Sequence, residues 1–272
     1  MLLSGKDVAA RLKQQIAEQA EARSRAGRRP CLAILRVGEN GPDVAYEERV
    51  RKNGIELGIH VKTLAYPADI QEEALLSEVE KVNEDDSVDG MLIFRPLPGQ
   101  IDEDRIAQAV KPEKDADCMN PIQLQRLLTG DASAIAPCTP EAVIAILKHY
   151  EIPIEGKRVA VVNRSLVLGK PLALLFLQEN ATVTICHSKT RDLAEVLHQA
   201  DIVVTGIGKG RFFGAEYFNE NAVVIDVGIN FLDGRMCGDV DLEAVRDKVA
   251  AITPVPGGVG AVTSTILLKH IL

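Results

Sequence analysis

Helix-like and strand-like segments alternate along most of this 272-residue chain, and this alternation restricts the fold more than any other feature. A polar, Ala-rich helical pattern at 2–27 precedes a short apolar run at 31–37 that is typical of a strand. Further helices are expected at 44–57 and 71–83, and further strands at 60–66 and 88–94. Because parallel strands need crossover connections, the pattern predicts an α/β fold with a mainly parallel sheet.

The second half repeats the alternation after a helix predicted over 137–150. Thr139 is the expected N-cap of this helix, and Pro140 its first helical residue. Strands are expected at 158–162, 182–186, 201–205 and 222–227, and together they predict a Rossmann-type nucleotide-binding unit. We therefore expect two domains, 1–140 and 141–260, with a cleft between them and a terminal helix at 261–272 that packs back on the first domain.

Composition excludes several classes of partner. Apolar residues make up 46% of the chain and charged residues 26%, as in an ordinary soluble protein. The net charge of −8 disfavours nucleic acid and anionic lipid as partners, so an anionic ligand needs a local site. The N-terminus lacks a signal-peptide core, and the five cysteines have no CxxC pairing. We expect a cytoplasmic protein with reduced thiols, and no metal-ligand spacing predicts a metal site.

A candidate phosphate-binding turn follows the first strand of the second half. It runs from Asn163 through Arg164 and Ser165 to Gly169, before a helix expected to begin near Lys170. Backbone N–H groups at a helix N-terminus bind phosphate, aided by the helix dipole. The usual GxGxxG spacing is missing, however, so this turn alone could equally be an ordinary strand-to-helix connection.

The end of the next strand favours NADP over NAD. An NAD site has an acid there for the ribose 2′-hydroxyl, whereas this strand ends in Cys186-His-Ser-Lys-Thr190. Ser188, together with Arg164 on the neighbouring turn, suits a 2′-phosphate through charge-assisted hydrogen bonds. The alternative is a solvated basic turn.

Three glycine-rich turns then follow at strand ends. They contain Gly206 and Gly208 (TGIG), Ile229 (DVGIN) and Gly260 (TPVPGGVG). Glycine at the carboxyl ends of parallel strands lets backbone approach a ligand closely. Three such turns in succession favour a ligand site at this edge.

These motifs resemble the bifunctional methylenetetrahydrofolate dehydrogenase/cyclohydrolase family. DVGIN at 226–230, GDV at 238–240 and TPVPGGVG at 253–260 are similar to the family's C-terminal motifs. CHSKT at 186–190, PCTP at 137–140, PLP at 96–98 and KDAD at 114–117 are similar in the same order. The resemblance covers essentially the whole chain.

The resemblance implies a folate-binding N-terminal domain, an NADP-binding second domain and a homodimer formed through the latter. It implies oxidation of 5,10-methylenetetrahydrofolate to the methenyl form with NADP, then hydrolysis to 10-formyltetrahydrofolate. Tyr46 corresponds to the tyrosine near the folate rings, and Asp117 to the aspartate that binds the pterin. The implied substrate site comprises Tyr46, Phe94, Pro96, Asp117, Gly260 and Ala261, and the cofactor site Asn163, Arg164, Ser165, Ser188, Gly206, Gly208, Ile229 and Thr265.

The chain departs from the family pattern at two linked catalytic positions. Val50 occupies the position of the lysine one helical turn after Tyr46, and Phe94 that of the glutamine that steers this lysine. Arg49 cannot serve as a base because its guanidinium stays protonated, and Lys52 points more than about 90° away from Tyr46 on an ideal helix. In addition, Asn163 replaces a glycine and Ala261 a proline of the family pattern.

These departures predict unequal effects on the two reactions. Hydride transfer needs orientation and cofactor placement, whereas hydrolysis needs general acid–base catalysis worth about 10²–10⁴-fold. We therefore expect a dehydrogenase with an impaired cyclohydrolase step. Two alternatives stay open: a non-catalytic relative that binds dinucleotide or folate, and an enzyme with a more apolar substrate in the same cleft.

Overall fold

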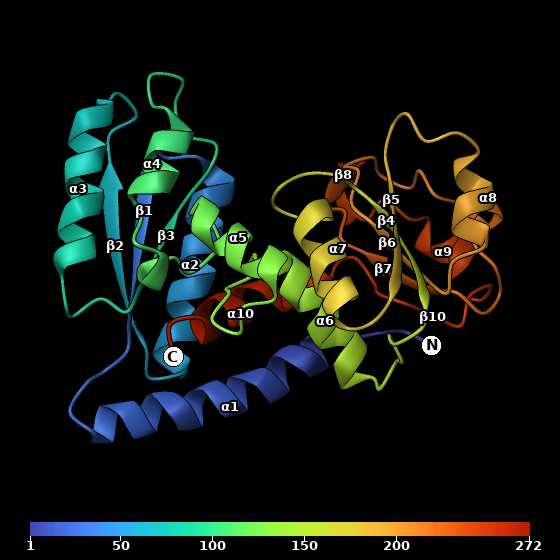
Figure 1. The fold of residues 1–272 in the computed structure, drawn as a ribbon, viewed down its shortest axis with the longest axis horizontal. Helices are drawn as coiled ribbons and strands as arrows, with labels where there is room; N and C mark the ends of the chain where they lie inside the picture. Colours follow the sequence, from blue (N-terminus) through green and yellow to red (C-terminus); the bar gives the residue numbers. More distant parts are fainter. The chain divides into compact units, whose positions relative to one another are not determined.

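The computed structural model describes all residues 1–272 and divides them into two compact units. Residues 1–10 and 137–263 form one unit, here called the large-sheet unit, and residues 11–136 and 264–272 form the small-sheet unit. Each unit contains a parallel sheet with helices, which confirms the predicted two-domain α/β fold (Figure 1).

The small-sheet unit contains three parallel strands in the order β2-β1-β3. Residues 31–35 of the central strand are all buried, as expected for a strand covered on both faces. Helix α2 contacts β2, and α3 packs against α4. The elements are β1 (Cys31–Val37), α2 (Gly41–Glu56), β2 (His60–Tyr66), α3 (Glu72–Glu84), β3 (Gly90–Ile93), α4 (Glu103–Ala109), η1 (Pro112–Lys114) and α5 (Pro121–Thr129).

The large-sheet unit contains five parallel strands in the order β10-β7-β6-β4-β5. From β4 the chain first adds β5 on one side and then crosses to β6 on the other. The switch point of this doubly wound sheet, where such folds bind ligands, therefore lies at the carboxyl ends of β4 and β6. The strands are β4 (Arg158–Val162), β5 (Thr182–Cys186), β6 (Ile202–Thr205), β7 (Val223–Asp226) and β10 (Ala251–Ile252).

The remaining elements of the large-sheet unit surround this sheet. Strands β8 (Asn230–Leu232) and β9 (Arg235–Cys237) form a separate antiparallel hairpin. The helices are α6 (Cys138–His149), α7 (Gly169–Gln178), α8 (Leu193–His198), η2 (Ala215–Tyr217), α9 (Leu242–Val245) and η3 (Val259–Ala261).

Two further helices have residues in both units. Helix α1 (Gly5–Arg25) leaves the large-sheet unit after Ala10, and α10 (Thr263–Lys269) leaves it after its first residue. Within the small-sheet unit, Asn53 donates a hydrogen bond to the Ser264 hydroxyl at 3.2 Å. Arg23 donates to the Ile271 carbonyl at 2.9 Å, so the C-terminal residues are held by α1 and α2.

The strands at 31–37, 60–66, 158–162 and 182–186 begin and end as predicted. The prediction for Thr139 is wrong: α6 begins at Cys138, with Pro137 as its N-cap and Pro140 as its third residue. A helix can start there because the N–H groups of its first turn need no intrahelical acceptor, so Pro140 removes no hydrogen bond. The final helix is also shorter than expected, since a 3-10 turn occupies its first residues.

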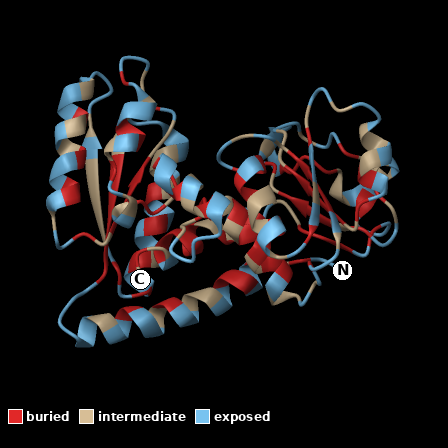
Figure 2. Ribbon diagram, in the orientation of Figure 1, coloured by how far each residue is buried: buried red, intermediate tan, exposed pale blue.

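Burial follows the inner strands of the sheets, drawn red in Figure 2, whereas the edge strands β2 and β5 are mostly intermediate or exposed. All five cysteines are buried, and none forms a disulfide. Burial raises the pKa of the Cys31 and Cys186 thiols and raises that of Cys118 to about 12. No helix has the length and apolar character needed to cross a bilayer.

The N-terminal residues extend the edge of the large sheet. Leu3 donates a backbone hydrogen bond to Ile252 at 2.8 Å, and Ile252 donates to Met1 at 2.9 Å. The Leu3 side chain is 0% exposed, whereas that of Leu2 is 51% exposed. Burial of Leu3 therefore attaches this segment to β10.

We expect Leu3→Ala to lower the free energy of unfolding by about 2–5 kcal/mol, because it leaves a cavity in a packed core. Leu2→Ala is the matched control and should stay within about 0.5 kcal/mol of the parent chain. Urea unfolding followed by circular dichroism measures both. Equal effects of the two substitutions would contradict the role given to Leu3.

Candidate functional site

The turn after β4 is organised by one side chain. The Asn163 side-chain oxygen Oδ1 accepts hydrogen bonds from the Ser165 backbone N–H and hydroxyl, both at 2.8 Å, and from the Gly169 N–H at 3.1 Å. Its amide nitrogen donates to the Gly206 carbonyl at 2.5 Å. Asn163 thus joins the turns after β4 and β6 at the switch point, and the Arg164 side chain beside it is exposed.

The segment after β5 carries exposed polar side chains and has no acid at the strand end, as the sequence predicts. Ser188 and Lys189 are exposed, and the His187 N–H donates to the Thr190 hydroxyl at 2.8 Å. The first carboxylate after the strand is that of Asp192, at the start of α8. No acid therefore occupies the strand end, where it would repel a 2′-phosphate.

Asp239 fixes the loop after β6. This residue is 0% exposed, and its carboxylate accepts hydrogen bonds from the backbone N–H groups of Ile207, Gly208 and Lys209. It also accepts from the Asn230 side-chain amide at 2.9 Å. One buried carboxylate therefore holds both the loop that contains Gly206 and Gly208 and the start of β8.

Asp226 fixes the adjoining turns in the same way. It ends β7, and its carboxylate accepts from the N–H groups of Gly228 (2.9 Å), Asp239 (3.1 Å) and Val240 (2.8 Å). The Thr205 hydroxyl donates to it at 3.2 Å. Burial raises the pKa of Asp226 to about 6, and the negative charge of Asp239 contributes.

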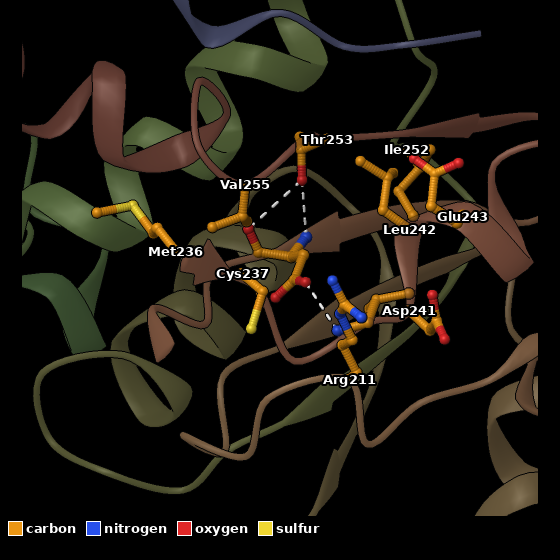
Figure 3. Close-up of a pocket in the computed structure, with 12 residues that line it drawn as sticks. Arg211, Met236, Cys237, Asp241, Leu242, Glu243, Ile252, Thr253 and Val255 are labelled. Carbon is orange, nitrogen blue, oxygen red and sulfur yellow. Dashed lines mark hydrogen bonds between the residues drawn. The ribbon is translucent and has the colours of Figure 1, made fainter. Parts of the chain in front are cut away.

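A small pocket of about 140 Å³ lies beside Asp226. Figure 3 shows Thr253 at this pocket, where its hydroxyl accepts from the Asp226 N–H at 2.8 Å, while Arg211 lies on the opposite side in this view. Two glycines complete the packing: a Cβ on Gly238 would lie 1.9 Å from the Asp226 carboxylate, and one on Gly228 2.4 Å from that of Asp239. The glycines of these motifs are therefore needed by the buried carboxylates.

The structure brings together most of the cofactor residues expected from the sequence. Asn163, Arg164, Ser165, Gly206, Gly208, Ser188 and Ile229 all follow neighbouring strands of the large sheet, and Ile229 is 58% exposed. Thr265 is 0% exposed and belongs to the small-sheet unit, and its hydroxyl has no hydrogen-bond partner within the chain, so its contact with the cofactor stays a prediction. It lies on the inner side of α10, whereas Thr263 at the start of the helix is partly exposed.

Asp226 and Asp239 were not among the site residues expected from the sequence. Both are in the quoted motifs DVGIN and GDV, where an acid is adjacent to, or two positions from, a glycine. This pattern is also typical of exposed turns, so only the burial distinguishes them.

Two of the residues expected to contact substrate form an aromatic pair in the small-sheet unit. The rings of Tyr46 and Phe94 meet edge to face, with centroids 5.9 Å apart. The Arg49 guanidinium lies over the Tyr46 ring, 5.4 Å from its centroid. Both contacts are individually favourable, so Phe94 and Arg49 fix the position of the tyrosine ring.

Glu47 and Val50, which follow Tyr46 in α2, point into the core, whereas the two residues between them are exposed. Val50 is 0% exposed. Glu47 is buried and forms an ion pair with Arg36 at 2.8 Å, and it also accepts from the Thr63 hydroxyl at 2.9 Å. Its two carboxylate oxygens are therefore used to attach α2 to β1 and β2.

Asp117 lies beside a small hollow that Arg95 and Asp115 also line. Asp115 is buried, and desolvation raises its pKa despite hydrogen bonds from the Asp117 and Asn120 N–H groups at 3.2 and 2.7 Å. Asp117 is partly exposed, and Pro96 is exposed. No group of three or more His, Cys, Asp or Glu side chains is arranged to hold a metal ion.

An open parallel sheet with glycine-rich turns and basic groups at its switch point defines a dinucleotide-binding α/β protein. Residues 3–117 match the catalytic domain of tetrahydrofolate dehydrogenase/cyclohydrolase, and residues 137–272 match its NAD(P)-binding domain. The chain therefore belongs to the tetrahydrofolate dehydrogenase/cyclohydrolase family.

Individual relatives agree over the whole length. The bifunctional protein FolD 1 of Desulfitobacterium hafniense is 48% identical over 272 residues, which are 100% of this chain and 97% of the relative. The crystal structure of the bifunctional FolD enzyme of Campylobacter jejuni has a TM-score of 0.97 at 38% identity, covering 100% and 96% of the two chains. The Trypanosoma brucei enzyme, solved with NADP and an inhibitor, has a TM-score of 0.94 at 35% identity, covering 100% and 95%.

The raised pKa of Asp226 predicts a pH-dependent cost in stability. The folded chain binds this proton more tightly than the unfolded chain, so the contribution of Asp226 is largest at acidic pH and is lost as the pH rises toward 6. Relative to Asp226→Asn, the parent chain should lose about 2 kcal/mol between about pH 4.5 and about pH 7. Urea unfolding at both pH values measures this change. A difference that does not vary with pH would show that Asp226 titrates normally.

Proposed function

We propose that this chain catalyses the NADP-dependent oxidation of 5,10-methylenetetrahydrofolate to the 5,10-methenyl form, and that the following hydrolysis to 10-formyltetrahydrofolate is impaired. The observation that carries the second part is the position of Val50, which is wholly buried where the family pattern places a lysine. Phe94 replaces the glutamine partner of this lysine and packs on Tyr46.

NADP is the cofactor that the residues at the switch point fit. Arg164 and Ser188 supply a cation and a hydroxyl for the 2′-phosphate, and no carboxylate stands at the end of β5. Gly208 and Gly260 are exposed and leave backbone accessible, and a Cβ on Gly208 would meet no atom within 4 Å. NADP, when bound, accepts a hydride. The relative of known structure from Trypanosoma brucei was solved with this cofactor.

The oxidation requires little chemistry from the protein. We assign Tyr46 to packing against the folate rings and Asp117 to hydrogen bonding with the pterin, with Pro96, Gly260 and Ala261 as further substrate contacts. No proton needs to be removed from the carbon that loses the hydride, so orientation and electrostatics are sufficient. Phe94 and Arg49 hold Tyr46 in place for this role.

Hydrolysis makes a larger demand, because a water molecule must be activated. Val50 has no ionisable group, and the Arg49 guanidinium stays protonated. Glu47 is the carboxylate next to Tyr46 in α2, but Arg36 and Thr63 are hydrogen-bonded to its two oxygens. Without a general base we expect hydrolysis to be slower by about 10²–10⁴-fold than with one.

Two assays on the pure protein test this proposal. NADPH absorbance should appear when 5,10-methylenetetrahydrofolate and NADP are mixed with the chain, whereas loss of methenyltetrahydrofolate should barely exceed the uncatalysed rate. Val50→Lys combined with Phe94→Gln should raise the hydrolysis rate by at least about tenfold, since it supplies a base and its partner. Val50→Leu with Phe94→Leu is the apolar control and should not. Rapid hydrolysis by the parent chain would contradict the impaired step, and dinucleotide binding without turnover would favour a non-catalytic relative.

We further propose that the chain forms a homodimer through the large-sheet unit. The β8–β9 hairpin exposes Phe231 (69%), Leu232 (40%) and Met236 (40%), and Ile229 precedes it. Neighbouring apolar side chains exposed on one hairpin are typical of a surface that is covered in an assembly. A twofold interface places the same surface of two copies face to face, so the partner of this hairpin is the hairpin of a second copy of the chain.

Phe231→Ser should therefore shift the protein from dimer to monomer, because it removes the largest apolar side chain of the hairpin. Light scattering after gel filtration measures the mass. Leu177→Ser is the control, since Leu177 is exposed to a similar degree (62%) on α7. A monomeric parent chain would overturn this assignment.

A further inference from the structure

The N-terminus of α7 is already occupied by an acceptor from the chain itself. Gly169 is the first residue of this ten-residue helix, and the residue before it, Leu168, makes no side-chain capping hydrogen bond. The acceptor for the Gly169 N–H is instead the side-chain oxygen Oδ1 of Asn163, at 3.1 Å. A helix N-terminus of this kind is where dinucleotide folds usually bind phosphate.

The other donors of the inner turn are also used. The Ser165 N–H and hydroxyl both donate to Asn163 at 2.8 Å, and the Ser165 hydroxyl accepts from the Leu168 N–H at 3.2 Å. The Lys170 N–H donates to the Ser165 carbonyl at 3.0 Å. The inner turn is therefore complete without a ligand.

Two backbone donors on the outer part of the turn, the N–H groups of Leu166 and Val167, have no acceptor within the chain. The Arg164 N–H lies on the inner side against Gly169, so Arg164 can offer its guanidinium group to a ligand but not this N–H. Leu166 and Val167 are 58% and 49% exposed, and the Arg164 side chain is exposed beside them. A phosphate could reach these groups from solvent without displacing Asn163.

We propose that Asn163 is a positioning residue that takes the place of a phosphate at the N-terminus of α7, so that the dinucleotide phosphates bind at Arg164, Leu166 and Val167. This inference rests on the proposed NADP-binding function. It also explains how a turn without GxGxxG glycines keeps its shape: the same amide is tied to Gly206 after β6.

Amide hydrogen exchange in the full chain, with and without NADP, tests the proposal. Without ligand, the Gly169 N–H should exchange roughly tenfold more slowly in the parent chain than in Asn163→Ala, because one hydrogen bond is lost. Asn163→Asp keeps the acceptor oxygen and should retain this protection. Asn219→Ala removes a comparable loop-bridging side chain elsewhere in the same unit and should leave Gly169 unchanged.

Exchange measured with NADP shows whether Asn163 positions the turn or whether phosphate binds directly at the Gly169 N–H. In the parent chain NADP should slow exchange at Leu166 and Val167 but change Gly169 by less than about twofold. In Asn163→Ala it should slow Gly169 by roughly tenfold, because a phosphate now takes the vacated position. A tenfold slowing of Gly169 by NADP in the parent chain would show that phosphate displaces Asn163, and would overturn the proposal.

A separate ligand isolates this inference from the cofactor assignment. If NADP alters no amide in any variant, the assignment of NADP fails. Inorganic pyrophosphate added to Asn163→Ala and to the parent chain then decides the role of Asn163 alone. Slowing of Gly169 in the variant only supports the proposal, and the same response in both proteins overturns it.

Discussion

Two buried carboxylates hold the ligand edge of the large sheet together. Asp226 and Asp239 between them accept hydrogen bonds from six backbone N–H groups in three consecutive turns, together with the Thr205 hydroxyl and the Asn230 amide. Buried charges are costly unless they are fully hydrogen-bonded, so these turns have little freedom to rearrange. The glycines beside them are explained by the same constraint, since a Cβ at Gly228 or Gly238 would overlap a carboxylate. The turns that carry Gly206, Gly208 and Ile229 are thereby preformed.

The small-sheet unit shows a different use of charge. Val50 lies in the core, and Phe94 packs against Tyr46. The charged groups nearby stabilise the fold: Arg36 and Glu47 form an ion pair within the unit, and the Arg49 guanidinium lies over the Tyr46 ring. The proposed substrate site thus holds an aromatic pair that can orient a ring system, while the Glu47 carboxylate beside it is already paired, which is why we separate oxidation from hydrolysis in the proposal.

Much of the architecture could be predicted because the signals are local. Short strand-like runs locate β1, β2, β4 and β5 to the residue, and proline or glycine lies next to the first two at Pro30, Gly38 and Pro67. Features that depend on distant partners could not be predicted. The pairing of Glu47 with Arg36, the burial of Thr265 and the two acceptor clusters around Asp226 and Asp239 are set by tertiary packing, which leaves no periodic trace in the sequence. Asn163 could be predicted in part: the sequence shows its position in the turn, but not its hydrogen bond to Gly206.

The central claim is that the switch point of the large sheet selects a 2′-phosphorylated dinucleotide through Arg164 and Ser188. Calorimetric titration of the pure chain with NADP and with NAD tests it most directly. The account predicts that NADP binds at least about tenfold more tightly than NAD, as expected for charge-assisted hydrogen bonds to a phosphate. Equal affinity for the two dinucleotides, or no affinity for either, would contradict it.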